Sequence, residues 1–376
     1  MNDRRRVLVV VGTRPEAIKL APLVLRLQAE PESFEVTVCA TGQHREMLDA
    51  MLATFGIEPQ VDLDLMRPGQ SPNAVAQGIF GGLDPLLAET SPHWLVVQGD
   101  TTTAMAAALA AFHRRVPVAH VEAGLRTGDL QAPFPEEMNR RVVDLVADAL
   151  FAPTARSAAA LRAEGVPAKR IHVTGNTVVD ALHWIAARQG AVDEDGRLVL
   201  LTAHRRESFG EPLRRVFSAV ARLADRFPDL RFVFPVHPNP QVREAASVLA
   251  GRQNVDLVEP ASYEQLVAWL RACRLVLTDS GGIQEEAPAF GKPTLVLRET
   301  TERPEGVEAG VALLVGTDEE RIVAEATRLL SDDEAYAAVA RRANPYGDGR
   351  AAERIAAVLA GRPSEDLSAF GTGSGT

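Results

Sequence analysis

Cysteine is scarce in this sequence: the 376 residues include only Cys39 and Cys273, which lie far apart. Two such residues provide neither a disulfide framework nor a multi-cysteine metal site. Unpaired cysteines are typical of proteins that stay in a reducing compartment. We therefore expect a cytoplasmic protein without a disulfide framework.

The sequence also lacks any apolar run that approaches the roughly 20 residues needed to span a bilayer. Three arginines at positions 4–6 precede an apolar run, residues 7–11, in the manner of a signal peptide. That run has only five residues and meets Gly-Thr-Arg-Pro at once, so we expect a first buried strand there. We expect neither a membrane span nor a cleaved leader.

Lysine occurs only at positions 19, 169 and 292, so arginine supplies nearly all of the positive charge. The 40 basic side chains are outnumbered by 50 acidic ones, which gives a formal net charge of −10. Proteins that bind nucleic acid or an anionic membrane need a basic face, so we expect neither kind of partner. A local cluster of cations can nevertheless hold a phosphorylated ligand in an acidic protein.

What the sequence does contain is a regular alternation of short apolar runs with longer amphipathic stretches. Many of the runs are continuously apolar, as in parallel strands that are buried on both faces. The alternation predicts an α/β fold with two doubly wound, Rossmann-like sheets. The expected strands span residues 7–11, 35–40, 94–98, 118–121, 149–152, 170–173, 198–202, 231–235, 255–257, 275–278, 294–297 and 312–314.

The length of the chain fits about two domains. A polar stretch at residues 192–197 follows a helical pattern, and we place the domain boundary close to it. We expect an N-terminal Rossmann-like domain over 1–178 and a C-terminal one over 179–344. The helical pattern within 345–362 is expected to pack back on the first domain, and the Gly/Ser-rich end, 363–376, is expected to be disordered.

Polar and glycine-rich residues follow the carboxyl ends of six expected strands. Ligands of open parallel sheets bind at this edge, so these residues are candidates for a site. They lie at 12–16, 99–103 and 122–126 in the first half, and at 204–207, 237–240 and 279–282 in the second half.

The segment 278–287 combines a strand end, two glycines and the start of a helix. Free N–H groups and the helix dipole at such a turn suit a phosphate, and Glu286 is placed to reach a ribose hydroxyl beyond it. The alternative is an ordinary helix cap with glycines in a tight turn. The segment matches neither the P-loop nor the dinucleotide-binding pattern, so ATPase and NAD-dependent functions find no support.

Arg14 and Lys19 flank the first strand–helix turn. Together they can hold a diphosphate, the arginine through its fork and the lysine as a point charge. The alternative is a helix start whose cations face solvent.

Three carboxylates are candidates for proton transfer. Asp100 and Glu122 follow neighbouring strands, and paired carboxylates can divide acid and base roles; the alternative for Asp100 is a helix cap. Glu136 opens a helix together with Glu137. The alternative here is structural, because both suit the positive helix start, and each has an arginine four residues further on.

Of the eight histidines, His204 and His237 lie at strand ends in the second half. Metal binding would need a third ligand, and the sequence has no HExxH motif or cysteine cluster, so we expect no metal site. A histidine that faces a phosphate or transfers a proton fits these positions better. For His237, which three prolines flank, the alternative is a rigid structural turn.

Ten longer motifs follow one another along the chain. They are GTRPEAIK (12–19), GQHREM (42–47), GDTTT (99–103), HVEAGLRT (120–127), PEEMNR (135–140), TGNTVVD (174–180), HRRESF (204–209), DSGGIQEEA (279–287), TTERPE (300–305) and NPYGDG (344–349). Together they closely resemble the motifs of the bacterial non-hydrolysing UDP-N-acetylglucosamine 2-epimerases, over residues 6–360.

The resemblance implies a glycosyltransferase-B-like architecture with the active site in the interdomain cleft, UDP bound by the C-terminal domain, and a homodimer. It implies an isomerase that interconverts UDP-N-acetylglucosamine and UDP-N-acetylmannosamine for cell-envelope polysaccharide biosynthesis, with no cofactor and no metal. By motif position the catalytic residues are Asp100, Glu122, Glu136 and His204. The substrate-binding residues are Arg14, Lys19, His204, Ser280, Gly281, Gly282, Glu286 and Arg303. A second substrate molecule, acting as an activator, would contact Gln43, His44, Gln70 and His237.

The chemistry of such an epimerase accounts for these residue types. The C2 proton of the sugar lies beside no carbonyl group, so simple deprotonation is too costly. Loss of UDP from C1 together with the C2 proton gives a 2-acetamidoglucal intermediate, and UDP and a proton then return with inversion at C2. A carboxylate base is needed at C2, and cations must stabilise the departing diphosphate.

Three other functions fit the same motifs. A hydrolysing epimerase would release free N-acetylmannosamine and UDP, a glycosyltransferase would require an acceptor, and a nucleotide-sugar sensor would bind without catalysis. Free UDP measured over many turnovers identifies the first. A sensor would keep its function in Asp100→Asn.

Overall fold

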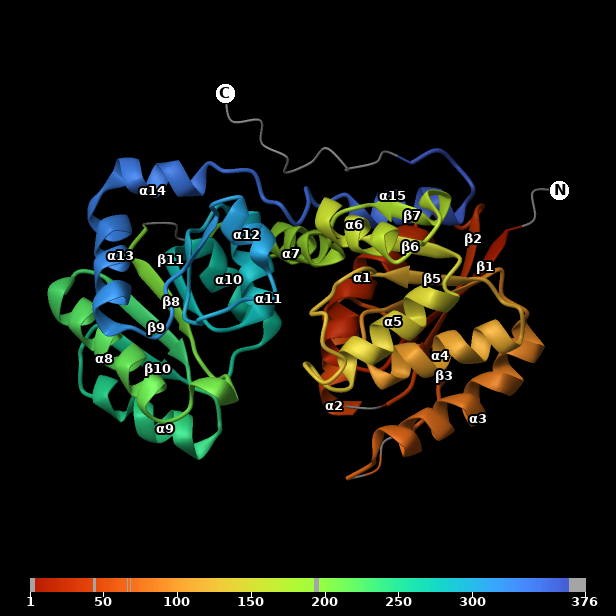
Figure 1. Ribbon diagram of the computed structural model, residues 1–376, viewed down its shortest axis with the longest axis horizontal. Helices are drawn as coiled ribbons and strands as arrows, with labels where there is room; N and C mark the ends of the chain where they lie inside the picture. Colours follow the sequence, from red (N-terminus) through yellow and green to blue (C-terminus); the bar gives the residue numbers. More distant parts are fainter. Residues whose placement is uncertain (1–3, 43–44, 66, 68, 193–195, 365–376) are drawn as a thin grey trace. The chain divides into compact units, whose positions relative to one another are not determined.

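This computed structural model of the chain describes residues 4–364, except for 43–44, 66, 68 and 193–195. The chain forms two compact units (Figure 1). Of the described residues, those up to Ala181 and those from Gly347 on form the first unit, and those from Leu182 to Tyr346 form the second. The boundary after Ala181 lies within helix α7 (Thr177–Arg188). The boundary expected from the sequence, after residue 178, lies within the same helix.

The first unit is built on a parallel sheet of seven strands in the order β3-β2-β1-β4-β5-β6-β7. The strand order reverses between β1 and β4, which is where open α/β sheets bind ligands. Residues Val7 to Val11 of β1 are at most 1% exposed, as expected for a strand covered on both faces. The strands are β1 (Arg5–Val11), β2 (Phe34–Ala40), β3 (Val61–Asp62), β4 (Trp94–Gln98), β5 (Val118–Val121), β6 (Ala149–Ala152) and β7 (Ile171–Val173).

Helices cover this sheet, and α4 packs against both α3 and α5. The buried side of α4 consists largely of alanine, whose small side chains allow the helices to approach closely. Helix α1 packs against α2 and against α15, which comes from the end of the chain. The helices are α1 (Arg14–Gln28), α2 (Arg45–Thr54), α3 (Pro72–Thr90), α4 (Thr102–His113), α5 (Glu136–Val146), α6 (Ala155–Ala163), α7 and α15 (Ala351–Leu359), with a short 3-10 turn η1 (Ala168–Arg170).

Asp180 fastens α15 to the rest of the first unit. Its carboxylate accepts hydrogen bonds from the backbone N–H groups of Ala351 (3.2 Å) and Ala352 (2.8 Å), which open that helix. These N–H groups have no partner within the helix, so the buried carboxylate satisfies them.

We expect the contribution of Asp180 to stability to decrease as the pH rises. Burial raises the pKa of this carboxyl to about 6, above the value of about 3.9 in an unfolded chain. Its contribution is therefore complete below about pH 4 and is lost as the pH rises through about 6, by about 2–3 kcal/mol. Unfolding free energies of the wild type and Asp180→Asn, compared across this range, check the prediction, and parallel curves would contradict it.

The second unit contains a parallel sheet of six strands in the order β10-β9-β8-β11-β12-β13, so its strand order reverses between β8 and β11. Its core is formed by the apolar strands and the buried face of α8. The strands are β8 (Leu198–Thr202), β9 (Arg231–Pro235), β10 (Val255–Val258), β11 (Cys273–Thr278), β12 (Thr294–Val296) and β13 (Ala312–Leu314). The helices are α8 (Glu211–Arg226), α9 (Pro240–Ala246), α10 (Tyr263–Ala272), α11 (Gly281–Glu286), α12 (Pro304–Glu308), α13 (Glu319–Ser331) and α14 (Asp333–Ala340), with 3-10 turns η2 (Arg206–Ser208), η3 (Ser247–Leu249) and η4 (Ala287–Phe290).

Each unit contains one cysteine, Cys39 in β2 and Cys273 in β11, and both thiols are free and buried. Burial raises the pKa of each to about 12, so neither forms the thiolate that nucleophilic chemistry requires. Among the residues that the structure describes, no helix is both long and apolar enough to cross a membrane.

Candidate functional site

The two strand ends at the reversal point of the first sheet are tied together by Glu16, in the first turn of α1. Its buried carboxylate accepts hydrogen bonds from the backbone N–H of Gly12 (2.9 Å), which follows β1, and from the hydroxyl of Thr101 (2.6 Å), which follows β4. Burial raises the pKa of Glu16 even though these bonds oppose the shift. A Cβ atom on Gly12 would lie 2.7 Å from Thr103 Oγ1, so the close approach of the two turns requires glycine.

A cavity of about 560 Å³ opens beside these turns, entirely within the first unit. Four residues that the sequence nominated for a site line it, namely Arg14, Gln70, Asp100 and Glu136. Within the described residues, neither the guanidinium of Arg14 nor the carboxylate of Glu136 has a hydrogen-bond or ion-pair partner. The cavity therefore presents one cation and one carboxylate that are available to a ligand.

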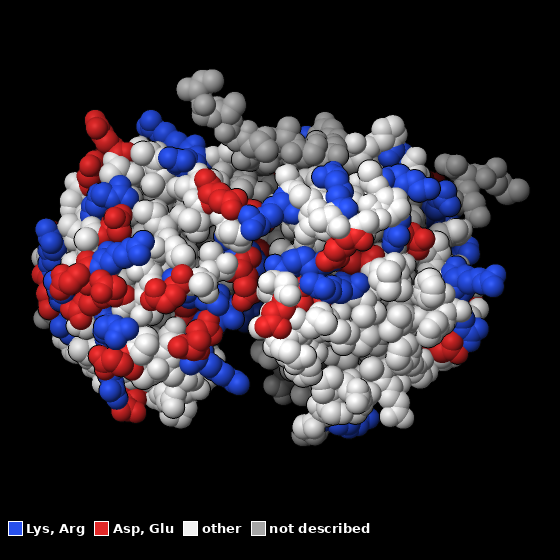
Figure 2. All heavy atoms as spheres, in the orientation of Figure 1, with Lys and Arg blue, Asp and Glu red and all other residues white. Residues whose placement is uncertain are grey.

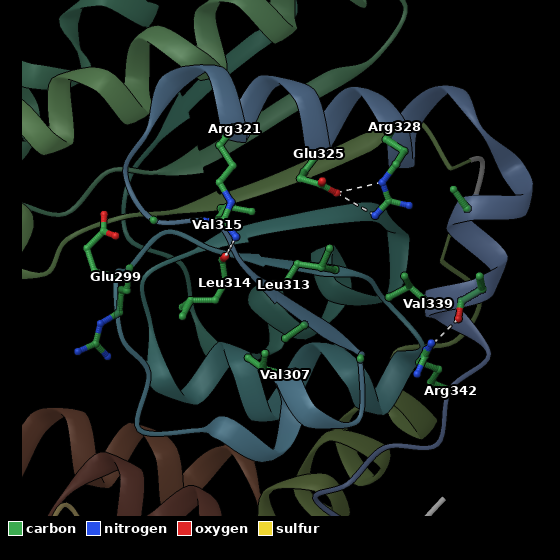
Figure 3. Close-up of a pocket in the computed structure, with 16 residues that line it drawn as sticks. Glu299, Val307, Leu313, Leu314, Val315, Arg321, Glu325, Arg328, Val339 and Arg342 are labelled. Carbon is green, nitrogen blue, oxygen red and sulfur yellow. Dashed lines mark hydrogen bonds and ion pairs between the residues drawn. The ribbon is translucent and has the colours of Figure 1, made fainter. Parts of the chain in front are cut away.

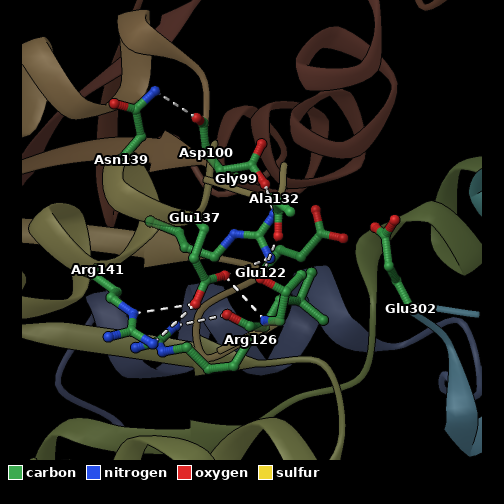
Figure 4. A network of polar contacts seen from close by, with 12 residues as sticks. Gly99, Asp100, Glu122, Arg126, Ala132, Glu137, Asn139, Arg141 and Glu302 are labelled. Atoms are coloured by element: carbon green, nitrogen blue, oxygen red, sulfur yellow. Dashed lines mark hydrogen bonds and ion pairs between the residues drawn. The ribbon is translucent and has the colours of Figure 1, made fainter. Parts of the chain in front are cut away.

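Asp100 lies at the cavity wall and is held in place by α5. Its carboxylate forms an ion pair with Arg140, and its backbone carbonyl accepts a hydrogen bond from the Asn139 side chain at 2.9 Å (Figure 4). The cap of α4 is Thr101, whose hydroxyl accepts from the N–H of Ala104 at 3.0 Å. Asp100 is thus not the helix cap, and its side chain, 28% exposed, remains at the cavity.

Glu122 is the most enclosed of the three candidate carboxylates. The Lys19 ammonium lies 2.6 and 2.7 Å from its two oxygens, and the side chains are 15% and 5% exposed, respectively. The Gln98 amide also donates to this carboxylate, and Asn176 donates at 3.4 Å. Glu122 adopts a left-handed backbone conformation, with φ of 68°, which brings its side chain back toward α1. Lys19 thus forms an ion pair with Glu122, a contact that was not predicted from the sequence.

The adjacent glutamates at the start of α5 have different surroundings. Glu137 is fully buried and accepts from the N–H groups of Thr127 (3.1 Å) and Gly128 (3.3 Å), so it holds the loop after β5 (Figure 4). It also pairs with Arg141 at 3.1 Å. The structural role considered for both residues therefore applies to Glu137, while Glu136 faces the cavity.

In the second unit, Asp279 organises the reversal point of the sheet. Its buried carboxylate accepts from the backbone N–H groups of His204 (2.6 Å) and Arg205 (2.7 Å), which follow β8. Ser280 is the N-cap of α11 but makes no side-chain capping bond. The free N–H groups of this helix start, including those of Gly281 and Gly282, thus lie next to the turn that contains His204.

Arg205 is a candidate that the sequence analysis did not single out. Its guanidinium lies 3.6 Å from the position that a Cβ atom of Gly281 would occupy, beside the helix start. In the described part of the chain, the side chain of Arg205 has no acidic partner. The signals in the sequence were its place in the segment 204–207 and in the HRRESF motif, but the approach to Gly281 depends on how Asp279 folds the turn.

His204 is partly exposed and stacks on His237, with ring centroids 5.4 Å apart and planes inclined by 10°. Its Nδ1 lies 3.4 Å from the carboxylate of Asp279. Burial lowers the pKa of His204, and the neighbouring His237 and Arg205 lower it further, against the effect of Asp279. His204 is therefore mostly neutral at neutral pH and can accept a proton or donate one hydrogen bond.

The other nominated residues of the second unit lie in polar contacts of their own. Glu286 is buried and accepts from the Tyr263 hydroxyl at 3.5 Å. Arg303 forms an ion pair with the buried Glu285. Of the proposed activator contacts, Gln70 accepts from the N–H of Arg67 at 2.9 Å, and Gln43 and His44 lie outside the described residues.

The second unit has a separate cavity of about 620 Å³ beside β13 (Figure 3). Its floor is apolar, and several of its arginines are already engaged within the unit. Arg321 donates to the Leu314 carbonyl at 2.7 Å, and Arg328 pairs with Glu325 at 2.9 Å. This cavity therefore lacks the uncommitted charges of the first one. Among the described residues, no group of three or more His, Cys, Asp or Glu side chains is placed to hold a metal ion.

A family model, a curated relative and a solved structure name the same family. The family model described as UDP-N-acetylglucosamine 2-epimerase matches residues 26–360. A Yersinia pestis protein with that name is 50% identical over 369 residues, which cover 94% of this chain and 98% of the relative. The crystal structure of UDP-GlcNAc 2-epimerase from Neisseria meningitidis bound to UDP-GlcNAc has a TM-score of 0.86 and 43% identity, covering 94% of this chain and 99% of its own.

Proposed function

Because this chain belongs to the UDP-N-acetylglucosamine 2-epimerase family, we propose that it interconverts UDP-N-acetylglucosamine and UDP-N-acetylmannosamine without net hydrolysis. The observation that carries the proposal is the cavity of the first unit, where Asp100 and Glu136 lie with Arg14 at the reversal point of a Rossmann-like sheet. Two carboxylates and a cation in one cavity supply the acid, base and anion-binding groups that the reaction requires.

In the proposed reaction a carboxylate takes the proton from C2 of the sugar while the bond from C1 to the diphosphate oxygen breaks. The electron pair of the C2–H bond becomes the C1=C2 double bond, and the C1–O pair leaves with UDP. Return of UDP to C1 and of a proton to the opposite face of C2 gives the epimer. Two different acid–base groups are needed, since the proton leaves one face of C2 and returns to the other.

The surroundings of the carboxylates suggest how they divide these roles. Glu136 has no partner in the described residues and faces the cavity, so its charge is free to change during the reaction. Asp100 and Glu122, by contrast, each form an ion pair with a cation, Arg140 and Lys19 respectively. We assign proton removal or return to Glu136, with Asp100 as its partner and with Glu122, which Lys19 holds in place, as the third member of the catalytic group.

In this scheme the second unit binds the diphosphate. The backbone N–H groups of Gly281 and Gly282, at the start of α11, are placed to donate to an anion, and the helix dipole adds a positive potential. His204 and Arg205 lie in the adjacent turn, which Asp279 fixes. A neutral His204 can donate one hydrogen bond to a phosphate oxygen, and Arg205 supplies the charge that stabilises UDP as it leaves.

Replacement of Arg205 by methionine is expected to weaken UDP binding about 10–100-fold, because one charge-assisted contact is worth about 1.5–3 kcal/mol. Isothermal titration calorimetry with UDP measures the change. The exposed Arg206, next in the same turn, provides the matched control: Arg206→Met should bind UDP like the wild type. Equal affinities for all three proteins would contradict the assignment of Arg205.

The non-hydrolysing course of the reaction has a direct test. The protein is incubated with UDP-N-acetylglucosamine over many turnovers, and the products are separated by anion-exchange chromatography. We expect UDP-N-acetylmannosamine in a constant ratio to its epimer, with no continuing accumulation of free UDP. Stoichiometric release of UDP and N-acetylmannosamine would instead identify a hydrolysing epimerase.

A homodimer is also part of the proposal, and the first unit has a face that suits one. Leu145 of α5 is 76% exposed and Phe112 of α4 is 55% exposed, and Figure 2 shows few charged side chains over α3 and α4. Exposed apolar residues on a face poor in charge are typical of a protein interface. A second copy of this chain is the partner that the proposal assigns to this face.

Leu145→Glu is expected to convert the dimer into a monomer without loss of folding stability, since the side chain is largely exposed within one chain. Size-exclusion chromatography with light scattering gives the mass of each species. Val248, which is 45% exposed in the second unit, provides the control, and Val248→Glu should stay dimeric. If Leu145→Glu has the same mass as the wild type, this face is not the interface.

A further inference from the structure

His120 is buried within β5, and both of its ring nitrogens face hydrogen-bond acceptors. Nδ1 lies 2.6 Å from Asp144 Oδ1, and Nε2 lies 2.8 Å from the carbonyl oxygen of Gly99. A neutral imidazole has a single N–H, and its other nitrogen is an acceptor. The neutral ring would therefore set a lone pair against one of the two oxygens, whereas the imidazolium donates to both.

His120 lies at one end of a chain of charged side chains. Asp144 of α5 also pairs with Arg126 at 2.7 Å, and Arg126 pairs with Glu164 at 2.6 Å. Burial by itself would raise the pKa of Asp144, but His120 and Arg126 bring it below its ordinary value. With His120 protonated, these four side chains carry two positive and two negative charges. Arg170, the last residue of η1, donates to backbone carbonyls among the described residues of this region.

This network joins the three segments that carry the proposed acid–base groups. The Gly99 carbonyl belongs to the turn that leads into Asp100, and Asp144 accepts from the N–H of Gly124 at 3.3 Å, in the turn after Glu122. Gly99 and Gly124 both have positive φ, at 72° and 86°. The third segment is α5, which contains Asp144 and begins at Glu136.

We propose that His120, as an imidazolium paired with Asp144, is a positioning residue that fixes Asp100, Glu122 and Glu136 relative to one another. It does not touch the substrate. Its two hydrogen bonds join the turn after β4 to α5 through the interior of the first unit. This inference rests on the proposed epimerase function, because it concerns the geometry of the groups that transfer the proton.

Two substitutions separate the two hydrogen bonds. The amide nitrogen of asparagine lies near the position of Nδ1 and can donate to Asp144, whereas that of glutamine lies near Nε2 and can donate to Gly99. We expect His120→Asn to lower kcat about 100-fold with little change in KM, because the turn that carries Asp100 is released. His120→Gln should recover part of this loss. His172 of β7, in the same sheet, supplies the control, and His172→Asn should keep the kcat of the wild type.

Loss of thermal stability with an unchanged kcat in both His120 variants would reduce His120 to a structural residue and overturn the proposal. Since a variant can also fail to fold, the wild type provides a second test. In ¹⁵N-labelled protein, the histidine signals that disappear in His120→Gln belong to His120. Both of its ring nitrogens are expected to carry a proton in the folded protein, since each faces an oxygen acceptor.

The nitrogen spectrum is recorded without substrate, so it distinguishes the two possible failures. An active wild type in which His120 is a neutral tautomer near pH 7 contradicts the positioning proposal. A wild type that forms no UDP-N-acetylmannosamine, although His120 is doubly protonated, contradicts the proposed function.

Discussion

Glu136→Gln is expected to lower kcat about 10³-fold while UDP binds nearly as before. Glu136 lines the cavity of the first unit and has no partner in the described residues. Glutamine retains the size and polarity of the side chain but cannot exchange a proton. Since no hydrogen bond or ion pair within the described chain is lost, the unfolding free energy should hardly change. Steady-state rates, UDP titrations and thermal unfolding of the same sample measure the three quantities.

Glu137, the next residue, provides a comparison for Glu136→Gln. Glu137 is buried and holds the loop after β5 through two backbone N–H groups, so Glu137→Gln should lower the unfolding free energy. Glu89, at the end of α3, is exposed. Glu89→Gln is therefore the control for both variants and should change neither kcat nor the unfolding free energy. If Glu136→Gln turns over at the rate of the wild type, Glu136 transfers no proton and the assignment of roles in the cavity is wrong.

Lys19→Met is expected to destabilise the protein by about 3–5 kcal/mol, because it leaves the carboxylate of Glu122 buried without its cation. The pair is close, at 2.6 Å, and the two side chains are 15% and 5% exposed. The double variant Lys19→Met/Glu122→Gln should recover most of this stability, since it removes the unpaired charge. Denaturant unfolding of the wild type, both single variants and the double variant gives the coupling energy.

The activity of the double variant shows whether the Lys19–Glu122 ion pair has a catalytic role or only a structural one. The double variant should remain inactive although its stability has returned, because the proposal places Glu122 in the catalytic group. A single Lys19→Met variant as stable as the wild type would contradict the burial argument. A double variant with full activity would instead remove Lys19 and Glu122 from the mechanism.

The fold class was predictable because apolar periodicity depends on local sequence. The α/β class with two doubly wound sheets is confirmed by the two parallel sheets and by the likeness to solved epimerases. The sequence analysis missed β3, which has only Val61 and Asp62 at the edge of the first sheet. Two residues are too few to show the period of a strand.

The sequence predicted which residues belong to the site better than it predicted the contacts between them. Motif order and strand ends indicated Asp100, Glu122 and Glu136. The partner of Lys19 could not be predicted, because it depends on the left-handed backbone at Glu122. Arg205 lay in a candidate segment but received no role for a similar reason, since its approach to Gly281 follows from a turn that tertiary contacts determine.

The central claim is that a protein carboxylate removes the C2 proton of a UDP-sugar and that the sugar regains a proton from solvent before it leaves. The most direct measurement is proton NMR of UDP-N-acetylglucosamine incubated with the protein in deuterium oxide. We expect the C2 proton signal to disappear from both recovered UDP-sugars, with one deuterium per molecule, and Glu136→Gln to slow this loss. Interconversion of the two sugars with the original C2 hydrogen retained would contradict the account.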